Sequence, residues 1–113
     1  MANSIKLSGD NYWDTSGIHG GEIFNSLSNI TSGQSKALTV PNSFRGILFI
    51  FLSSATAMGV YTVYSTSTGA ITLCPINAVT SNVTLTTATN RLTINNGAGG
   101  SIFPYYIGNN IIS

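Results

Sequence analysis

The chain has 113 residues but only seven charged side chains, four basic and three acidic, which is 6% of the sequence. Globular domains usually have about 25%, so serine (15), threonine (14) and asparagine (12) must provide much of the polar surface. The length predicts one domain. The four cations are scattered along the sequence, which excludes a basic surface for nucleic acid. The single cysteine excludes an intramolecular disulfide and a zinc site built on paired cysteines.

No targeting or membrane segment is evident in the sequence. The first six residues are not followed by an apolar stretch of signal-peptide length, and no later run approaches the roughly 18 apolar residues of a membrane-spanning helix. We therefore expect a protein made in the cytoplasm, without a signal peptide and without membrane insertion.

The first 33 residues differ in composition from the rest and predict a lead-in to the main domain. Residues 21–30 place apolar side chains at helical spacing, and Glu22 would lie in the first turn, where the helix dipole favours an acidic group. We expect one short helix here, ending before Gly33. Its apolar residues are Ile23, Phe24, Leu27 and Ile30.

From residue 34 onward, short segments rich in β-branched residues alternate with turn residues. This pattern predicts an all-β fold, an antiparallel β-sandwich or jelly roll of about seven or eight strands over residues 34–113. The predicted strands are Lys36–Val40, Arg45–Ser53, Met58–Ser65, Ala70–Leu73, Asn82–Thr86, Arg91–Asn95, Ile102–Ile107 and Ile111–Ile112.

Turn residues define how these strands connect. Gly69 supplies a positive φ for a hairpin between the third and fourth strands. Pro75 restricts the end of the fourth strand to a sheet edge or a bulge, because proline has no N–H for the ladder. Residues 108–110 predict a last tight hairpin before the final two isoleucines.

One predicted strand is too apolar for a sheet with one wet face. Residues 47–52 are six consecutive apolar residues, whereas a half-exposed strand alternates. Either the monomer buries both faces, or the core covers one face and a neighbouring subunit the other, which we favour. The candidate interface residues are Ile23, Phe24, Leu27, Ile47, Phe49 and Phe51.

No group of residues indicates catalysis, and we expect no metal and no cofactor. His19 lies beside two glycines, and a Gly-x-Ser-x-Gly motif is missing, so a surface or turn histidine is the simpler interpretation. Asp10 and Asp14 could act as paired carboxylates or calcium ligands, but acids in such a polar loop more often form turns and caps.

Cys74 fits a small buried hydrophobic residue. The glycines of residues 97–100 precede a strand pattern and therefore no helix dipole for an anion.

Binding is the chemistry that the side chains favour. Tyrosine rings offer flat faces on which sugars stack, and amides can hydrogen-bond sugar hydroxyls. Tyr105 and Tyr106 must face opposite sides of a strand, so only one can lie in the core. The candidate ligand-binding residues are Tyr105, Tyr106, Asn109 and Asn110. Because Lys36 lies at the junction with the lead-in, only Arg45 and Arg91 remain as charges in the body of the β domain, and binding should depend weakly on salt.

Several segments resemble bacteriophage proteins. Residues 10–18, DNYWDTSGI, resemble the "sWDssGI" segment that precedes a short trimerising helix in many tail-fibre and minor virion proteins. Residues 32–40, 44–49, 58–64 and 90–97 resemble the distal β domains of the same proteins. Together these segments span nearly the whole chain.

The resemblance implies a phage virion structural protein, assembled as a homotrimer after synthesis in the host bacterial cytoplasm. Residues 1–33 would attach it to other virion proteins and trimerise it, and residues 34–113 would bind a host cell-surface glycan as a tail-fibre or baseplate tip. No catalytic residues come with the resemblance, so we expect no enzyme. The alternative is a capsid, neck or tail decoration whose partners are other virion proteins. A third candidate, a hydrolase of surface polysaccharide, would require exposed acids that the chain hardly has.

Overall fold

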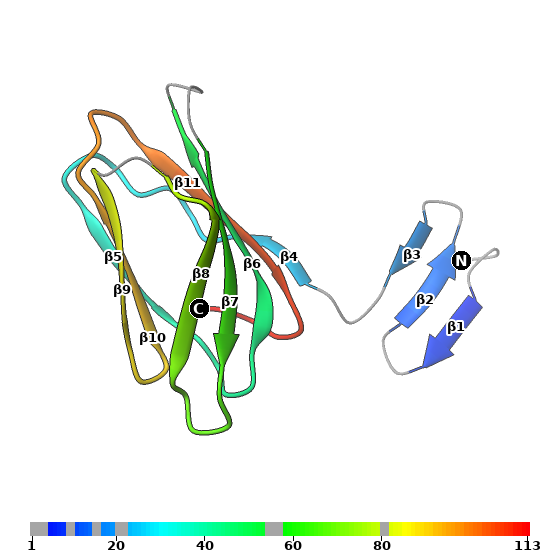
Figure 1. Cartoon of the computed structure of the whole chain (residues 1–113). Coiled ribbons are helices and arrows are strands. Elements are labelled where there is room, and N and C mark those ends of the chain that lie inside the picture. The colour runs from blue at the N-terminus through cyan, green and yellow to red at the C-terminus, as the bar shows by residue number, and fades with distance from the viewer. Residues whose placement is uncertain (1–4, 9–10, 15–16, 20–22, 54–57, 80–81) are drawn as a thin grey trace.

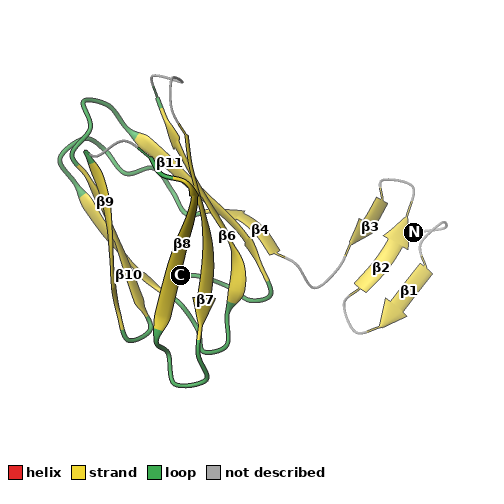
Figure 2. Ribbon diagram, in the orientation of Figure 1, coloured by secondary structure: helices red, strands yellow, loops and turns green. Residues whose placement is uncertain are grey.

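The computed structural model describes residues 5–8, 11–14, 17–19, 23–53, 58–79 and 82–113, and every regular element within them is a β-strand (Figure 1, Figure 2). No helix in this part of the chain is long and apolar enough to cross a membrane. Three short strands form a small antiparallel sheet of their own: β1 (Ile5–Ser8), β2 (Asn11–Asp14) and β3 (Gly17–His19).

The other eight strands form two antiparallel sheets that face each other. The larger sheet has the order β4-β11-β6-β7-β8, and the smaller has the order β5-β10-β9. The larger sheet consists of β4 (Ile23–Ser26), β11 (Ile102–Gly108), β6 (Arg45–Leu52), β7 (Met58–Ser65) and β8 (Ile71–Asn77). The smaller consists of β5 (Ser35–Thr39), β10 (Arg91–Asn96) and β9 (Val83–Ala88). The predicted antiparallel sandwich of seven or eight strands is confirmed.

The core lies between the two sheets and is made by alternate residues of their strands. Leu48 and Ile50 of β6 are fully buried, as are Leu92 and Ile94 of β10. Side chains of a strand point alternately to its two faces, so the odd-numbered residues of β6 point away from this core. The apolar run of β6 therefore supplies the core with one half of its residues and the outer surface with the other.

The short helix predicted at residues 21–30 is wrong for residues 23–30, which the structure describes. Residues 23–26 form β4, which pairs with β11 from Gly108 to Tyr105. Asparagine and serine favour non-helical backbone here, and Ser28 has a φ of 71°. A helix over residues 21–30 is short enough to be marginal on its own, whereas a strand can pair with the open edge of β11. Leu27 and Ile30 are buried all the same, so the apolar positions were identified but their period was misread. The sandwich consequently takes in residues that precede the predicted start at residue 34.

Two smaller expectations also differ from the structure. Residues 111–113 do not form a strand, so the predicted last hairpin is absent from this described segment. The chain instead turns back toward the smaller sheet, where the Ser113 amide donates a hydrogen bond to the Thr39 carbonyl at 3.0 Å. Cys74 is exposed rather than buried, because it lies on the outward side of edge strand β8.

The two turn residues with a specific backbone role are confirmed. Gly69 has a φ of 94° in the turn between β7 and β8. Pro75 lies in β8, the edge strand of the larger sheet, beside a register shift between Val60 and Tyr61 of β7. Proline is compatible with this place because an edge strand has one row of groups without a ladder partner.

Candidate functional site

The outer face of the smaller sheet is polar. Its cross-strand pairs place hydroxyl, amide and small side chains side by side, with one charged group, Arg91. The outward residues are Ser35, Ala37 and Thr39 of β5, Arg91, Thr93 and Asn95 of β10, and Thr84, Thr86 and Ala88 of β9. This surface shows how the chain presents a sheet to solvent with few charges.

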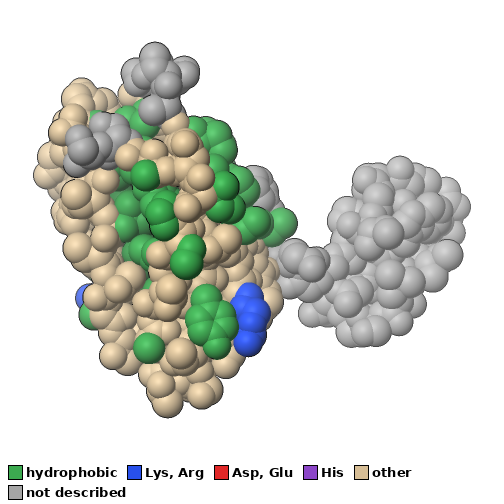
Figure 3. Space-filling model, in the orientation of Figure 1, with side chains coloured by type: hydrophobic (Ala, Val, Ile, Leu, Met, Phe, Trp, Pro, Cys, Tyr) green, Lys and Arg blue, Asp and Glu red, His purple; other side chains and the backbone are tan. Residues whose placement is uncertain are grey.

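The outer face of the larger sheet carries apolar residues on β6, β7 and β11, and the described part of the chain leaves them partly exposed. Phe51 is 38% exposed and Tyr64 43% exposed, and none of the outward apolar residues is fully buried. Figure 3 shows hydrophobic side chains at the right-hand side of the sandwich, where Figure 1 draws the larger sheet. We call the following nine residues the apolar face: Ile47, Phe49 and Phe51 of β6, Met58, Val60 and Tyr64 of β7, and Phe103, Tyr105 and Ile107 of β11.

Aromatic rings fill the centre of the apolar face. The Phe49 and Phe51 rings stack with centroids 6.5 Å apart and an interplanar angle of 15°. Tyr105 pairs with Phe49 across the strands and meets Phe51 edge to face, with ring centroids 5.7 Å apart. Both arrangements are favoured geometries for aromatic pairs, so this part of the face is a cluster of three mutually packed rings.

A basic and aromatic pair lies at the other end of the same face. Arg45, at the start of β6, pairs with Tyr64 of β7, and its guanidinium carbon lies 5.1 Å from the centre of the Tyr64 ring. This is a cation–π contact. Six residue steps of β6 separate Arg45 from Phe51, which is roughly 20 Å along an extended strand.

A surface depression of about 300 Å³ lies beside this pair, and we call it the Arg45 depression. Ile47 and Ile107, which pair across β6 and β11, supply its apolar side chains. The residues around it are Arg45, Gly46, Ile47, Ile107, Gly108 and Asn109.

Asn109 shapes the wall of the Arg45 depression through main-chain contacts. Its Oδ1 accepts a hydrogen bond from the Arg45 amide at 2.9 Å, and its Nδ2 donates one to the Ser43 carbonyl at 3.2 Å. Asn110 is exposed, and its Oδ1 accepts from the Ile111 amide at 2.8 Å. Both side-chain amides, predicted as ligand contacts, thus bind main-chain groups: Asn109 those of Ser43 and Arg45 at the start of β6, and Asn110 that of Ile111 in its own turn.

The structure separates the two adjacent tyrosines. Tyr106 is 1% exposed, its ring meets Phe44 at 6.2 Å in the core, and its hydroxyl accepts a hydrogen bond from the Ile112 amide at 3.0 Å. Tyr105 lies on the apolar face. The structure therefore leaves Tyr105 near the surface and gives Tyr106 a core role.

The residues predicted for a subunit interface also divide. Ile47, Phe49 and Phe51 lie on the apolar face, whereas Leu27 is 6% exposed and belongs to the core. Ile23 and Phe24 lie in β4, beside β11. Sequence reasoning did not select Arg45 with Tyr64, because the predicted strand bounds do not give the register of the β6–β7 hairpin that pairs them.

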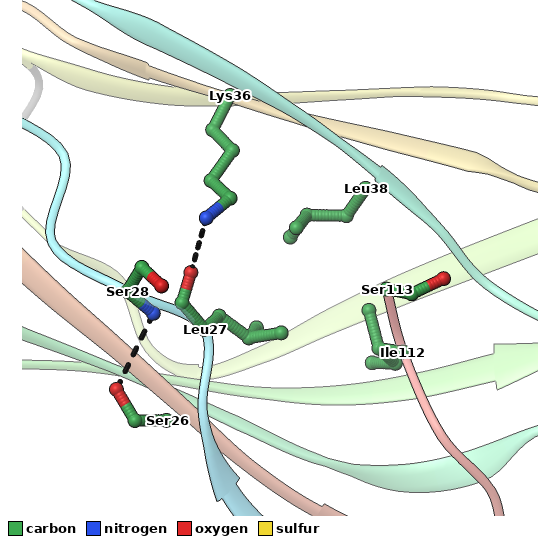
Figure 4. Close-up of a pocket in the computed structure, with 7 residues that line it drawn as sticks. All are labelled: Ser26, Leu27, Ser28, Lys36, Leu38, Ile112 and Ser113. Atoms are coloured by element: carbon green, nitrogen blue, oxygen red, sulfur yellow. Dashed lines mark hydrogen bonds between the residues drawn. The ribbon is translucent and has the colours of Figure 1, made fainter.

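A second pocket, of about 190 Å³, lies where β5, the end of β4 and the last residues meet (Figure 4). Lys36 extends across it and its Nζ donates a hydrogen bond to the Leu27 carbonyl at 2.6 Å. This bond ties β5 to the segment after β4, a structural role. The lining residues are Ser26, Leu27, Ser28, Lys36, Leu38, Ile112 and Ser113.

The described residues include no group of three or more histidine, cysteine, aspartate or glutamate side chains that could hold a metal ion. Of the acids and the histidine considered from the sequence, Asp14 lies in β2 and His19 in β3, while Asp10 and Glu22 fall outside the described residues.

The fold defines an antiparallel β-sandwich with one polar and one apolar outer face. No protein-family model and no curated protein matches the sequence. Among solved structures, the chain is similar to a tailspike protein, gp49, from Acinetobacter baumannii bacteriophage Fri1, a capsular polysaccharide depolymerase. The TM-score is 0.59 at 14% sequence identity, and the match covers 82% of this chain but 19% of the tailspike chain. The similarity establishes that the fold occurs within a phage tailspike.

Proposed function

We propose that the chain is a module of a phage tail that binds a polysaccharide of the host-cell surface. The observation that carries the proposal is the Arg45 depression, in which apolar side chains lie beside an arginine that also contacts the exposed ring of Tyr64. The fold similarity to a phage tailspike and the resemblance of residues 10–18 to tail-fibre proteins support the setting.

The chemistry of the depression suits a sugar. A pyranose ring has apolar C–H faces and a rim of hydroxyls, so it needs an apolar surface with a few placed polar groups. Ile47 and Ile107 provide the apolar part of the depression and Arg45 its hydrogen-bond donors. Tyr64 lies outside the lining, on the β7 side of Arg45, and its exposed ring offers a neighbouring surface for stacking. A volume of about 300 Å³ is at the small end of ligand pockets, which fits one unit of a polymer that continues across the surface.

The aromatic centre of the apolar face has a separate role in this proposal, as a contact between copies of the chain. On the outer face of the smaller sheet, the side chains that face water are mostly polar, whereas those of the apolar face are not. Large exposed apolar patches indicate interaction surfaces. A homotrimer of the kind implied by the tail-fibre resemblance would cover the centre and leave the Arg45 end accessible, with residues 1–33 attaching the assembly to other virion proteins.

The proposal gives the sandwich, residues 23–113, a binding role and no cleaving role. Residues 23–113 contain no aspartate, glutamate or histidine, and glycoside hydrolysis typically uses a pair of carboxylates on either side of the bond. The second candidate function is a virion decoration whose partners are other virion proteins, which the apolar face favours because a protein partner would also cover it.

Binding of purified host surface polysaccharide tests the proposal. We expect Tyr64→Ala to weaken binding about tenfold, since it removes a stacking surface and the support of Arg45, while Tyr64→Phe retains most of it. Thr86→Ala, on the opposite outer face, is the matched control and should bind as the parent does. If the parent protein binds no polysaccharide from its host, the decoration function takes its place.

A further inference from the structure

We infer that the Arg45 depression selects a sugar unit bearing a carboxylate, such as a hexuronate, over its neutral counterpart. The inference deepens the proposed function, because it names the ligand class for the same site and depends on that site binding polysaccharide. The features that carry it are the guanidinium of Arg45, its placement against Tyr64, and the lack of acidic side chains in residues 23–113, which form the sandwich.

Arg45 has no carboxylate partner in the described structure. No ion pair and no side-chain hydrogen bond engages its guanidinium there, and residues 23–113 contain no acidic side chain. A guanidinium has five N–H donors and no acceptor. The cation–π contact with Tyr64 orients the group and uses none of these donors as a hydrogen bond.

A carboxylate is the ligand group that such a guanidinium matches best. Its planar fork can donate two parallel hydrogen bonds to the two oxygens of a carboxylate, and these charge-assisted bonds are stronger than bonds to a neutral hydroxyl. A uronate carries its carboxylate on the sugar ring itself. When the ring rests on the apolar side chains Ile47 and Ile107, the carboxylate can lie toward Arg45 at the rim of the depression.

The other two cations of the sandwich lack this combination. The Lys36 ammonium is bound to the Leu27 carbonyl across the second pocket. Arg91 lies on the polar outer face, between Thr39 and Ala88 in the sheet register. Among the described charged side chains, Arg45 alone lies beside both an aromatic ring and an apolar depression, and no acidic side chain of residues 23–113 would repel an acidic ligand.

The test compares host surface polysaccharide before and after chemical reduction of its carboxyl groups, which turns uronates into neutral hexoses of the same linkage. We expect the full-length parent protein to bind the native polymer about tenfold more tightly than the reduced one. Arg45→Gln should remove this preference, so that native and reduced polymer bind equally, and Arg45→Lys should keep only part of it, because an ammonium is a point charge without the fork. Arg91→Gln is the matched control and should preserve the full preference. Thermal unfolding of each variant confirms that it is folded.

Each result decides the inference. Equal binding of native and reduced polymer, or tight binding of a polymer without carboxylates, overturns it and leaves the proposed function in place. A preference that persists in Arg45→Gln also overturns it, because the carboxylate would then bind elsewhere. Failure to bind either polymer removes the proposed function together with the inference.

Discussion

Asn96 lies at the end of β10 with 2% of its surface exposed, and its amide makes three hydrogen bonds to the main chain. Nδ2 donates to the Ile30 carbonyl at 2.8 Å and to the Gly100 carbonyl at 2.9 Å, and Oδ1 accepts from the Ala98 amide at 3.0 Å. We expect Asn96→Ala to lower the free energy of unfolding by about 2–4 kcal/mol, because buried main-chain groups then lack partners. Urea denaturation followed by circular dichroism measures this loss.

Thr84→Ala provides the control for Asn96→Ala. Thr84 is exposed on the outer face of β9, and its replacement should change the free energy of unfolding by less than about 0.5 kcal/mol. A loss for Asn96→Ala as small as that of Thr84→Ala would mean that water replaces the amide and that the residue 97–100 loop does not depend on it.

The tyrosines show how far single residues could be predicted from the sequence. Alternation along a strand required Tyr105 and Tyr106 to point in opposite directions, which the structure bears out, but alternation cannot say which of them faces the core. That choice follows from the pairing of β11 with β6, where Tyr106 opposes the buried Leu48. A buried tyrosine needs a partner for its hydroxyl, and Tyr61 and Tyr106 find theirs in loop amides, of Val79 and Ile112, that no sequence pattern identifies.

At the scale of the elements, β6 and β11 approach each other through a pair of glycines that accommodates the Phe44 ring. Gly46 pairs with Gly108, and a Cβ at Gly108 would overlap Cζ of Phe44 and lie 2.6 Å from its Cε2. We expect Gly108→Ala to destabilise the protein by about 1–3 kcal/mol through overpacking. In the Phe44→Leu background the same change should cost at least about 1 kcal/mol less, because leucine lacks the clashing atoms.

Chemical denaturation of the four proteins of this double-mutant cycle measures the coupling. Gly99→Ala is the control, since a Cβ there meets no atom within 4 Å and its φ is not positive; it should be neutral or slightly stabilising. Additive losses in the cycle would show that Gly108 is required for a reason other than the Phe44 ring.

Strands that are determined by residues near them in the sequence could be predicted, and strands that depend on a distant partner could not. The central strands were identified because a β-rich composition and turn residues at each end are local signals, and Met58–Ser65 was predicted with the bounds that the structure has. β4 was missed because its strand form depends on the open edge of β11, about 80 residues later in the chain. The Arg45 depression was missed for the same reason, since Ile47 and Ile107 come together only through the pairing of β6 with β11.

At the scale of the whole molecule, the charges divide between two parts of the chain. Residues 1–22 contain Lys6, Asp10, Asp14 and Glu22, and residues 23–113 contain three basic side chains and no acidic one. The first part thus has a net charge of −2 and the second of +3, which together give the net charge of +1. A subunit contact through the uncharged centre of the apolar face avoids placing these like charges against one another, so its strength should change little with salt.

The apolar face predicts that copies of the chain associate, and introducing a charge at one of its residues tests this prediction. Phe51→Asp places a carboxylate at the aromatic centre, where a contact between copies would bury it without a partner, so association should weaken by at least about tenfold. Thr86→Asp adds the same charge to the polar outer face and should leave association unchanged. Size-exclusion chromatography with light scattering, at micromolar concentration, measures the mass of each protein. A monomeric parent would contradict the prediction, and the apolar face would then have to be covered by a different virion protein, as the decoration function requires.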